Sequence, residues 1–502
     1  MPAFTRKTGL ILMALLLSTI PITSSPWAAK LTARSTVSPL AMVPLGLLLI
    51  VWLLPALLGR GEVPSFIAPL FFFVAVAALS SALSLFYEIY PSLLHLPKER
   101  VVRGMITLII GMGFYLVTTL FFDSEEELRK GLRWVYLGGV LTLLWASVQA
   151  YFVLRVGHFP REFQEIHRIF SIHDLPRDRV SGLAYEPSWL GDQLVILYLP
   201  LWMASVLRRT SVFGRGQRWI SVEWGLLIWG GAVFFLTKSR VSMLSLFVVI
   251  GFLVLVTGWK WAGGIGRWVL RKGQPSPSKI KITQGLVWIA MLAFFLLAVF
   301  GTLWFASRLD WRLESLFKLD HLADAFGSDT PFFSVAEQLA YAERVVYWDV
   351  GLRTFADYPV LGVGVGNVGL LFRKNTPAFG YRLVEMIRIL TSVQKVPNAK
   401  SLWVRLLAET GGIGFLLFVT WLVILGIGAW RLGQRRKGVM GMLGIAASLA
   451  LVAQIIEGFS LDTFALPHLW VMLGFVSAAV WIDGRRSPYR AARVDASSDS
   501  HS

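Results

Sequence analysis

The chain has 502 residues, of which 55% are hydrophobic and only 16% are charged, and its mean hydropathy is +0.63. Soluble domains carry about 25% charged residues, so this composition excludes an ordinary multidomain soluble protein. The formal net charge is +18 and cysteine is absent. A disulfide framework, a thiol nucleophile and a cysteine metal site are therefore excluded.

Apolar segments follow one another along the chain, each about long enough to cross a membrane as a helix. They comprise residues 10–24, 39–58, 66–86, 104–122, 134–154, 188–207, 222–237, 239–258, 285–305, 413–430, 439–457 and 466–482. The first, preceded by Arg6 and Lys7, also has the composition of a signal peptide. The apolar runs are continuous, which excludes an outer-membrane barrel. We predict an all-α polytopic membrane protein of about twelve transmembrane helices.

Lysine and arginine concentrate in four short connections that twelve crossings place on one side of the membrane. They are Arg208, Arg209, Arg215 and Arg218; Lys260, Arg267, Arg271, Lys272, Lys279 and Lys281; Arg431, Arg435, Arg436 and Lys437; and Arg485, Arg486, Arg490 and Arg493. By the positive-inside rule this side is cytoplasmic. No basic run alternates with aromatic residues, so nucleic acid is not an expected partner.

Two long connections lie on the opposite, outer side. We predict transmembrane helices 1–9 over residues 1–305, a large extracytoplasmic loop over 306–412, transmembrane helices 10–12 over 413–483 and a disordered cytoplasmic tail over 484–502. Apolar residues recur at helical spacing within the large loop, as at Val335, Leu339, Ala342 and Val346. This spacing predicts amphipathic helices on the outer face.

Arginines crowd both outer connections, although positive charge is disfavoured there. The shorter connection contains Arg155, Arg161, Arg168, Arg177 and Arg179, and the longer one contains Arg308, Arg312, Arg344, Arg353, Arg373, Arg382 and Arg388. Pairing with nearby carboxylates explains single arginines of this kind. As a set they indicate a site for an anionic ligand, because guanidinium groups bind phosphate oxygens in a bidentate manner.

Lys238 and Arg240 occupy a four-residue break between two apolar segments. Burying one such charge in lipid costs about 2.5–3.5 kcal/mol on insertion scales. Either these side chains reach the outer interface, or they hold the phosphate of a lipid headgroup. Glu186 directly precedes a membrane helix, where the helix dipole would stabilise it. It is alternatively a general base.

Several familiar sites are not indicated. The glycine-rich stretch at 359–369 matches GxGxxG but lacks a βαβ frame, so it predicts a tight turn or, alternatively, backbone N–H groups directed at a phosphate. Histidines show no zincin spacing, and neither a GxSxG elbow nor a Walker motif is present. We therefore expect no metal and no cofactor.

Four stretches together resemble the O-antigen ligase/polymerase superfamily, the Wzy-like integral-membrane glycosyltransferases. They are residues 179–191 with Glu186-Pro187-Ser188, residues 237–242, Arg344-x-x-x-Trp348 running into 359–367, and Pro397-Asn398 running into 409–414. The resemblance covers about residues 170–430. It implies a GT-C-like fold of about twelve helices with a large periplasmic loop before the last few.

The resemblance also implies site residues. Arg240 and Arg344 would bind the diphosphate of a lipid-linked donor, with Arg179 and Lys238 as further candidates. Glu186 and Arg344 would be catalytic, with Glu186 ranked ahead of His321 as the base. Asn398, Lys400 and His321 would form an acceptor or loop site.

Family ligases commonly have a histidine before the asparagine, but Pro397 stands there in this chain, which favours a polymerase. The implied activity is the polymerisation of undecaprenyl-diphosphate-linked repeat units into O-antigen or exopolysaccharide at the outer face of the bacterial cytoplasmic membrane. A chain-length regulator and a flippase of the same pathway are implied partners, beside membrane lipids. The alternatives are a ligase that transfers glycan to lipid A core, a flippase or exporter of lipid-linked glycan, and a non-catalytic assembly partner.

Overall fold

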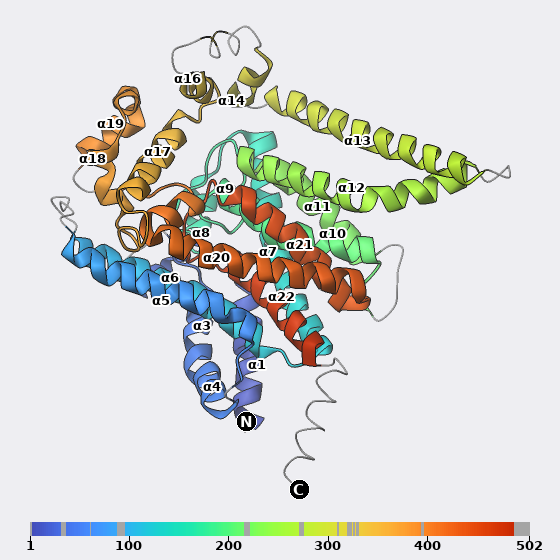
Figure 1. The fold of residues 1–502 in the computed structure, drawn as a ribbon, viewed down its shortest axis with the longest axis horizontal. Coiled ribbons are helices and arrows are strands. Elements are labelled where there is room, and N and C mark those ends of the chain that lie inside the picture. Colours follow the sequence, from blue (N-terminus) through green and yellow to red (C-terminus); the bar gives the residue numbers. More distant parts are fainter. Residues whose placement is uncertain are drawn as a thin grey trace.

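The computed structural model describes residues 3–31, 37–60, 62–87, 96–214, 221–270, 276–308, 311–318, 324, 327, 331–392 and 396–485 (Figure 1). These residues form helices and connecting loops, and their only β-type pairing is an isolated bridge between Ser24 and Ser38. Within this described part, nine helices are long and apolar enough to cross a membrane. The protein is therefore an all-α polytopic membrane protein, as the sequence predicted.

The helices of the first half are α1 (Ala3–Ser18), α2 (Pro26–Leu31), α3 (Met42–Leu48), α4 (Leu54–Arg60), α5 (Ala68–Leu83), α6 (Pro97–Phe121), α7 (Glu125–Tyr151), α8 (Arg161–His167), α9 (Pro187–Gln193), α10 (Leu199–Arg208) and α11 (Val222–Leu236). The second half contains α12 (Arg240–Val269), α13 (Pro277–Ser307), α14 (Trp311–Glu314), α16 (Pro331–Gln338), α17 (Ala342–Asp357), α18 (Phe372–Asn375), α19 (Val384–Thr391), α20 (Leu402–Arg435), α21 (Gly438–Glu457) and α22 (Pro467–Arg485). Each predicted apolar segment overlaps one of these helices or a continuous pair of them.

Three of the predicted segments overlap helices outside the nine that meet the spanning criteria. Helices α1 and α11 have only 16 and 15 residues, and α22 has 19 residues. Helices α3 and α4 are joined by a π-helical turn at Leu49–Leu53 and together form one span, as α9 and α10 do through a similar turn at Leu194–Tyr198. The hydropathy pattern therefore predicted where the apolar segments lie, whereas local backbone geometry determines the length of each helix.

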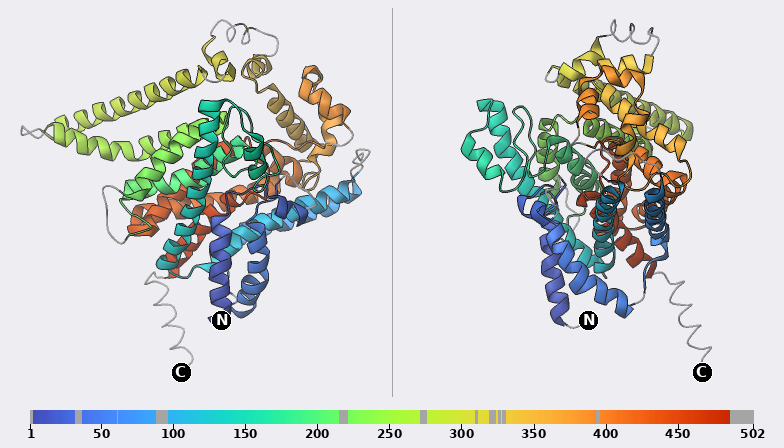
Figure 2. Two further views of the ribbon diagram at one scale, coloured as in Figure 1. Left: turned by 180° about the vertical axis from the view of Figure 1, so that it is seen from behind. Right: turned by 90° about the vertical axis from the view of Figure 1, so that its left-hand side faces the viewer.

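The central bundle brings helices from both ends of the chain together. Helix α22 packs on α6, α20 packs on α5 and α21, and α21 also contacts α10 and α12 (Figure 2). Small residues permit these close crossings: a Cβ atom added to Gly444 of α21 would lie only 2.2 Å from the backbone nitrogen of Gly433 in α20. The large fully buried aromatic residues, including Trp202, Trp421 and Trp470, fill the centre of this bundle.

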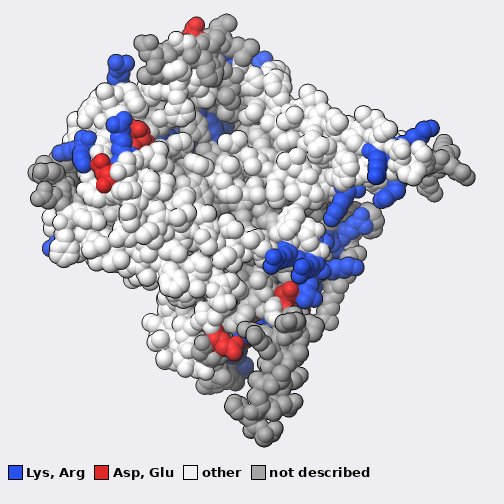
Figure 3. Space-filling view, viewed as in Figure 1, with Lys and Arg blue, Asp and Glu red and all other residues white. Residues whose placement is uncertain are grey.

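Helices α12 and α13 form a hairpin that projects from the bundle (Figures 1 and 2). Along α13 only Ser307 is buried, and the helix packs mainly against α12. Exposed basic side chains gather at the side of the molecule where this hairpin ends, away from α16–α19 (Figure 3). This arrangement agrees with a membrane-embedded hairpin whose tip carries the positive charge of a predicted inner loop.

Helices α16–α19 cover the opposite end of the bundle, where the sequence predicted amphipathic helices (Figure 1). The side chains of Val346 and Ala342 are buried in a separate small core of this region. Helix α20 begins at Leu402, inside the predicted loop, and is interrupted at Gly411, which has φ 65° and ψ −173°. Only glycine adopts this backbone conformation readily, so Gly411 separates an outer helical segment from the membrane-spanning part of α20.

Residues 362–369 of the glycine-rich stretch are buried inside the protein. The backbone N–H of Gly364 donates to Ser80 Oγ at 3.0 Å, and that of Val365 donates to Ser81 Oγ at 3.0 Å. Both serines belong to α5. The interpretation of these N–H groups as a phosphate cradle is therefore wrong, because buried serine hydroxyls already satisfy them.

Candidate functional site

A cavity of about 950 Å³ lies where the α12–α13 hairpin departs from the bundle. Its walls are mostly apolar, from Val153, Leu154, Phe235, Leu236, Met243, Ala298, Gly301, Phe305, Ala306 and Leu313. Charged side chains line one part of the cavity: Arg177, Asp178, Lys238 and Arg240. An apolar chamber with a cationic end has the polarity required to bind a lipid that carries an anionic headgroup.

The cations of the cavity are positioned by the break between α11 and α12. The Thr237 hydroxyl donates to the carbonyl of Phe234 at 2.7 Å, at the end of α11. Lys238 then adopts the left-handed region with φ 47°, and α12 begins at Arg240. The break therefore places the side chains of Lys238 and Arg240 in the lining of the cavity.

Asp178 is the counter-charge of this cationic group. Its carboxylate lies 3.4 Å from Lys238 Nζ and 3.9 Å from Arg179 Nε. The Asp178 side chain is 68% exposed, so its attraction for either cation is screened by solvent. Arg179 thus lies beside the cavity without lining it, whereas Lys238 and Arg240 line it directly.

Arg240 lines the cavity and also contacts the segment between α16 and α17. Its Nη1 donates to the carbonyl of Leu339 at 2.6 Å, its Nη2 donates to that of Ala340 at 3.2 Å, and its guanidinium lies 4.5 Å from the centre of the Tyr341 ring. Helix α17 begins at the next residue and carries Arg344 in its first turn. The fold therefore brings the two predicted diphosphate-binding arginines to the same region from positions 104 residues apart (344 − 240).

Arg344 does not line the cavity but contacts the loop between α21 and α22. Its Nη1 donates to the carbonyl of Ser460 at 3.3 Å. Tyr347, one turn later, donates its hydroxyl to Glu385 Oε1 at 2.7 Å. Burial, followed by the adjacent Glu385 carboxylate, raises the pKa of Tyr347, so this phenol stays protonated.

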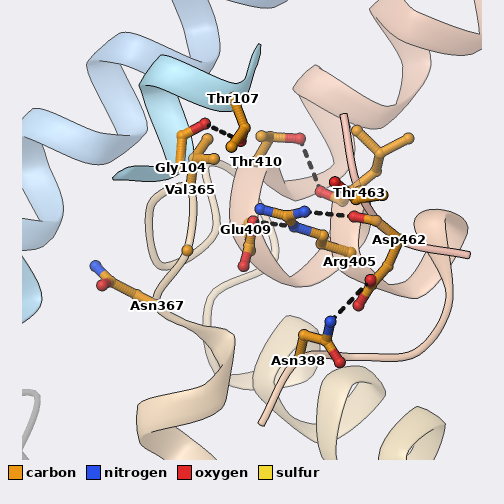
Figure 4. Close-up of polar contacts among 12 residues, drawn as sticks. Gly104, Thr107, Val365, Asn367, Asn398, Arg405, Glu409, Thr410, Asp462 and Thr463 are labelled. Atoms are coloured by element: carbon orange, nitrogen blue, oxygen red, sulfur yellow. Dashed lines mark hydrogen bonds and ion pairs between the residues drawn. The ribbon is translucent and has the colours of Figure 1, made fainter. Parts of the chain in front are cut away.

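The α21–α22 loop is also the partner of the predicted acceptor residues. Asn398 Nδ2 donates to Asp462 Oδ1 at 2.9 Å (Figure 4). The backbone N–H of Lys400 donates to Asp462 Oδ2 at 2.9 Å. The ammonium of Lys400 lies 5.9 Å from the centre of the Tyr347 ring. Asn398 and Lys400 therefore surround Asp462, a residue that the sequence did not single out.

A buried ion pair supports this loop from α20. Arg405 Nε lies 2.8 Å from Glu409 Oε2, and Arg405 also donates to the backbone carbonyl of Asp462 (Figure 4). The two side chains are 11% and 2% exposed. Because the pair is shielded from water, each side chain offsets the cost of burying the other.

Residues 225–419 match the family described as O-Antigen ligase. This segment belongs to the O-antigen ligase/polymerase superfamily. No curated protein matches the chain. The O-antigen ligase domain runs from α11 into α20 and contains Lys238, Arg240, Arg344, Asn398 and Lys400. The matched segment is therefore similar to membrane glycosyltransferases of the ligase/polymerase type.

Two predicted base candidates lie elsewhere or cannot be placed. Glu186 precedes α9 and lies before the O-antigen ligase domain; its Oε1 accepts a hydrogen bond from Ser188 Oγ at 2.6 Å. It does not line the 950 Å³ cavity. Glu186 is the residue directly before the first turn of α9, where the sequence offered stabilisation by the helix dipole as the structural explanation. His321 lies outside the described residues.

Sequence reasoning missed a cluster of ionisable side chains inside the bundle. Asp192 of α9, Glu457 of α21 and His468 of α22 are 1–2% exposed. His468 Nε2 contacts Asp192 Oδ2 directly. The signal was available in part, because ionisable residues within apolar membrane segments are costly and mark functional sites. Asp192 and Glu457 lie within predicted spans and His468 lies near the start of another.

Proposed function

We propose that the protein polymerises undecaprenyl-diphosphate-linked oligosaccharide repeat units into O-antigen or exopolysaccharide on the outer face of the cytoplasmic membrane, releasing undecaprenyl diphosphate. The 950 Å³ cavity carries this proposal, because it joins an apolar chamber to Arg177, Lys238 and Arg240. The chamber would hold the first isoprene units of the donor lipid. The cations would hold its diphosphate, with Arg344 added from α17.

The chemistry needed at this site is modest. The acceptor hydroxyl oxygen forms a bond with the anomeric carbon of the donor and releases its proton to water, while the bond from that carbon to the diphosphate oxygen breaks. The electron pair leaves with the diphosphate, which is stable as an anion and requires cations rather than a proton donor. Arginine and lysine side chains at the outer end of membrane helices supply that stabilisation, and the reaction consumes no nucleotide.

The ligase reaction is the second candidate, because the matched family is described as O-Antigen ligase. The two reactions share the donor and differ in the acceptor, which is lipid A core for the ligase and a second lipid-linked repeat unit for the polymerase. The proline at position 397, where family ligases commonly have histidine, favours the polymerase. A flippase is disfavoured because the cations of the cavity lie at helix ends, whereas transporters bind substrate near the middle of the membrane.

A reconstitution tests the proposal directly. Purified full-length protein in liposomes receives undecaprenyl-diphosphate-linked repeat units from the native pathway, without nucleotide and with EDTA. We expect a ladder of longer lipid-linked glycans on a gel. Product formed only after addition of lipid A core would replace the polymerase with the ligase. Absence of product with either acceptor would contradict both activities and favour a transport or assembly role.

Narrowing the cavity should slow the same reaction. Gly301 of α13 lines the cavity, and a Cβ atom added there meets nothing within 4 Å. We expect Gly301→Trp to raise the KM for the lipid-linked donor about tenfold or more, because the indole would occupy space needed by the isoprenoid chain. Gly285→Trp is the matched control, because Gly285 lies on the same helix with equally open surroundings and outside the cavity lining. Equal KM values for the two variants would contradict the placement of the lipid.

A further inference from the structure

A second cavity, of about 210 Å³, lies between α10, α12, α20 and α21. Helix α10 contributes its last two residues, Leu207 and Arg208, and α20 contributes Trp430, Gly433 and Gln434 from its final six residues. Both helices end on the side that the positive-inside rule predicts to be cytoplasmic, where exposed basic side chains gather (Figure 3). Helix α12 lines the 950 Å³ cavity with its first turn and this one only from residue 252 onward, so the two cavities are separate.

Three helices each turn one face to this inner cavity. Their lining residues recur at helical spacings of three and four: Leu253, Val256, Thr257 and Lys260 on α12; Trp430, Gly433 and Gln434 on α20; and Ile445, Ser448 and Leu449 on α21. Helices α12 and α20 both pack on α21. The inner cavity is therefore built by the packing of regular helices and not by a surface loop.

The end of the inner cavity nearer the middle of the membrane is apolar. The rings of Phe252 and Trp430 meet edge-on with their centres 6.4 Å apart, so they join α12 to α20. Lys260 and Trp261 lie about two turns further along α12, toward the inner surface. Trp261 and Trp430 are each 41% exposed, as expected for indoles at a membrane interface. The inner cavity thus leads from an aromatic end to a polar end at the membrane surface.

The polar end has two cations. Arg208 and Lys260 line it, and none of the described lining residues is acidic. Neither cation forms an ion pair with a described residue. The Nε atom of Arg208 is buried and has no hydrogen-bond partner in the described part of the chain. A buried donor without an acceptor is costly, so this one indicates an anion that the described residues do not supply.

The positive-inside rule alone does not account for Arg208. Cations that only fix the orientation of a helix can extend into water, as Arg267 of α12 and Arg431 of α20 do. Both are exposed and lie outside the lining of the inner cavity. Arg208 is half-buried instead and keeps its Nε atom inside the fold. This difference separates a built site from the general positive charge of the surface.

We propose that the inner cavity binds the headgroup phosphate of an anionic phospholipid from the leaflet on the predicted cytoplasmic side. Two cations without a carboxylate require an anion, and apolar and aromatic walls at the membrane interface favour an anion that is carried by a lipid. The phosphate oxygens accept hydrogen bonds from Arg208 and Lys260, while the lipid chains lie against Phe252 and Leu253. This lipid is distinct from the glycan donor, because its site is on the opposite side of the membrane, and its binding does not depend on the proposed glycosyl transfer.

Thermal unfolding of the purified full-length protein in detergent tests the site. The probes are dioleoyl phosphatidylglycerol, dioleoyl phosphatidylcholine and inorganic phosphate. We expect phosphatidylglycerol to raise Tm by about 3 °C or more at a concentration well above its Kd, because a ligand of the folded state stabilises that state. Phosphatidylcholine should give less than half of this shift, and inorganic phosphate should give none.

The double variant Arg208→Gln with Lys260→Gln should lose at least half of the shift that phosphatidylglycerol produces. The double variant Arg267→Gln with Arg431→Gln is the matched control, because it removes the same charge from the same end of α12 and α20 and leaves the inner cavity intact. It should keep the full shift. Each shift is measured against the Tm of the same variant without lipid, so a destabilised variant still gives a result.

Ser448→Leu provides a test that leaves every charge in place. The Ser448 hydroxyl donates only within α21, to the carbonyl of Gly444 at 2.9 Å, and a leucine side chain would fill part of the inner cavity. We expect this variant to lose at least half of the shift as well.

Three results would overturn the proposal. Equal shifts in the site variants and in the Arg267/Arg431 control would leave only a general attraction of anionic lipid to the basic surface. An equal shift with inorganic phosphate would make the ligand a free phosphate. An equal shift with phosphatidylcholine would mean that the charge of the lipid has no part in binding. Because the assay contains no glycan, none of these results bears on the proposed function.

Discussion

Replacement of Arg240 with alanine is expected to lower the initial rate of glycan transfer about 100-fold or more. The guanidinium lines the large cavity and is held by the carbonyls of Leu339 and Ala340. Its removal would leave part of the charge of the departing diphosphate without a partner in a site with mostly apolar walls. The liposome assay measures this effect at equal protein level, with the length of the glycan ladder as a second readout.

Two further variants separate the effect of the positive charge at position 240 from the effect of the planar guanidinium group. Arg240→Lys keeps the charge and loses the planar fork, so we expect an intermediate rate, about tenfold below that of the unsubstituted protein. Arg353→Gln is the control, because Arg353 lies on α17, is exposed and pairs with Asp349 at 2.7 Å. If Arg240→Ala elongated glycans as fast as Arg353→Gln, Arg240 would have no part in binding the diphosphate.

Replacement of Arg405 with methionine is expected to lower the free energy of unfolding by about 3–5 kcal/mol. Glu409, which is 2% exposed, would be left as a buried carboxylate without its ion-pair partner. The carbonyl of Asp462 would also lose a donor, so the α21–α22 loop would lose its support from α20. Thermal unfolding of the purified protein in detergent measures the loss.

The double variant Arg405→Met with Glu409→Met isolates the cause. Replacing both members of a buried ion pair with apolar residues of similar volume is often nearly neutral. We therefore expect the double variant to recover most of the stability lost by Arg405→Met. A double variant as unstable as Arg405→Met would mean that the contact of Arg405 with the Asp462 carbonyl, rather than the pair with Glu409, maintains the loop.

The loop between α21 and α22 connects the functional elements of the protein. Arg344 binds the carbonyl of Ser460, while Asn398 binds the carboxylate of Asp462. The loop is followed directly by Pro467 and His468 at the start of α22. A shift of this loop would therefore move a diphosphate candidate and an acceptor candidate together, although no sequence motif drew attention to it.

Sequence patterns determined the all-α membrane fold and the positions of its apolar segments, because hydrophobic length is a local property of the chain. They also identified Lys238 and Arg240 as candidate site residues. Two cations in a short break between apolar segments are costly to place in a membrane, so they indicate a functional site. The resemblance that named Arg344 agrees with the family match at 225–419. These features required only the order and spacing of residues.

Only the tertiary structure decided which of these residues meet. It paired Asp192 with His468, which lie 276 positions apart in the sequence. It also showed that backbone N–H groups of the glycine-rich stretch donate hydrogen bonds to serine hydroxyls of α5. It also formed the large cavity between the π-helical turn after α7 and helices α11, α12 and α13. Contacts of this kind arise when helices far apart in the sequence pack against one another. Hydropathy determines which segments enter the membrane, but it does not determine which faces of the helices contact one another. A single sequence therefore carries no local signal for these contacts.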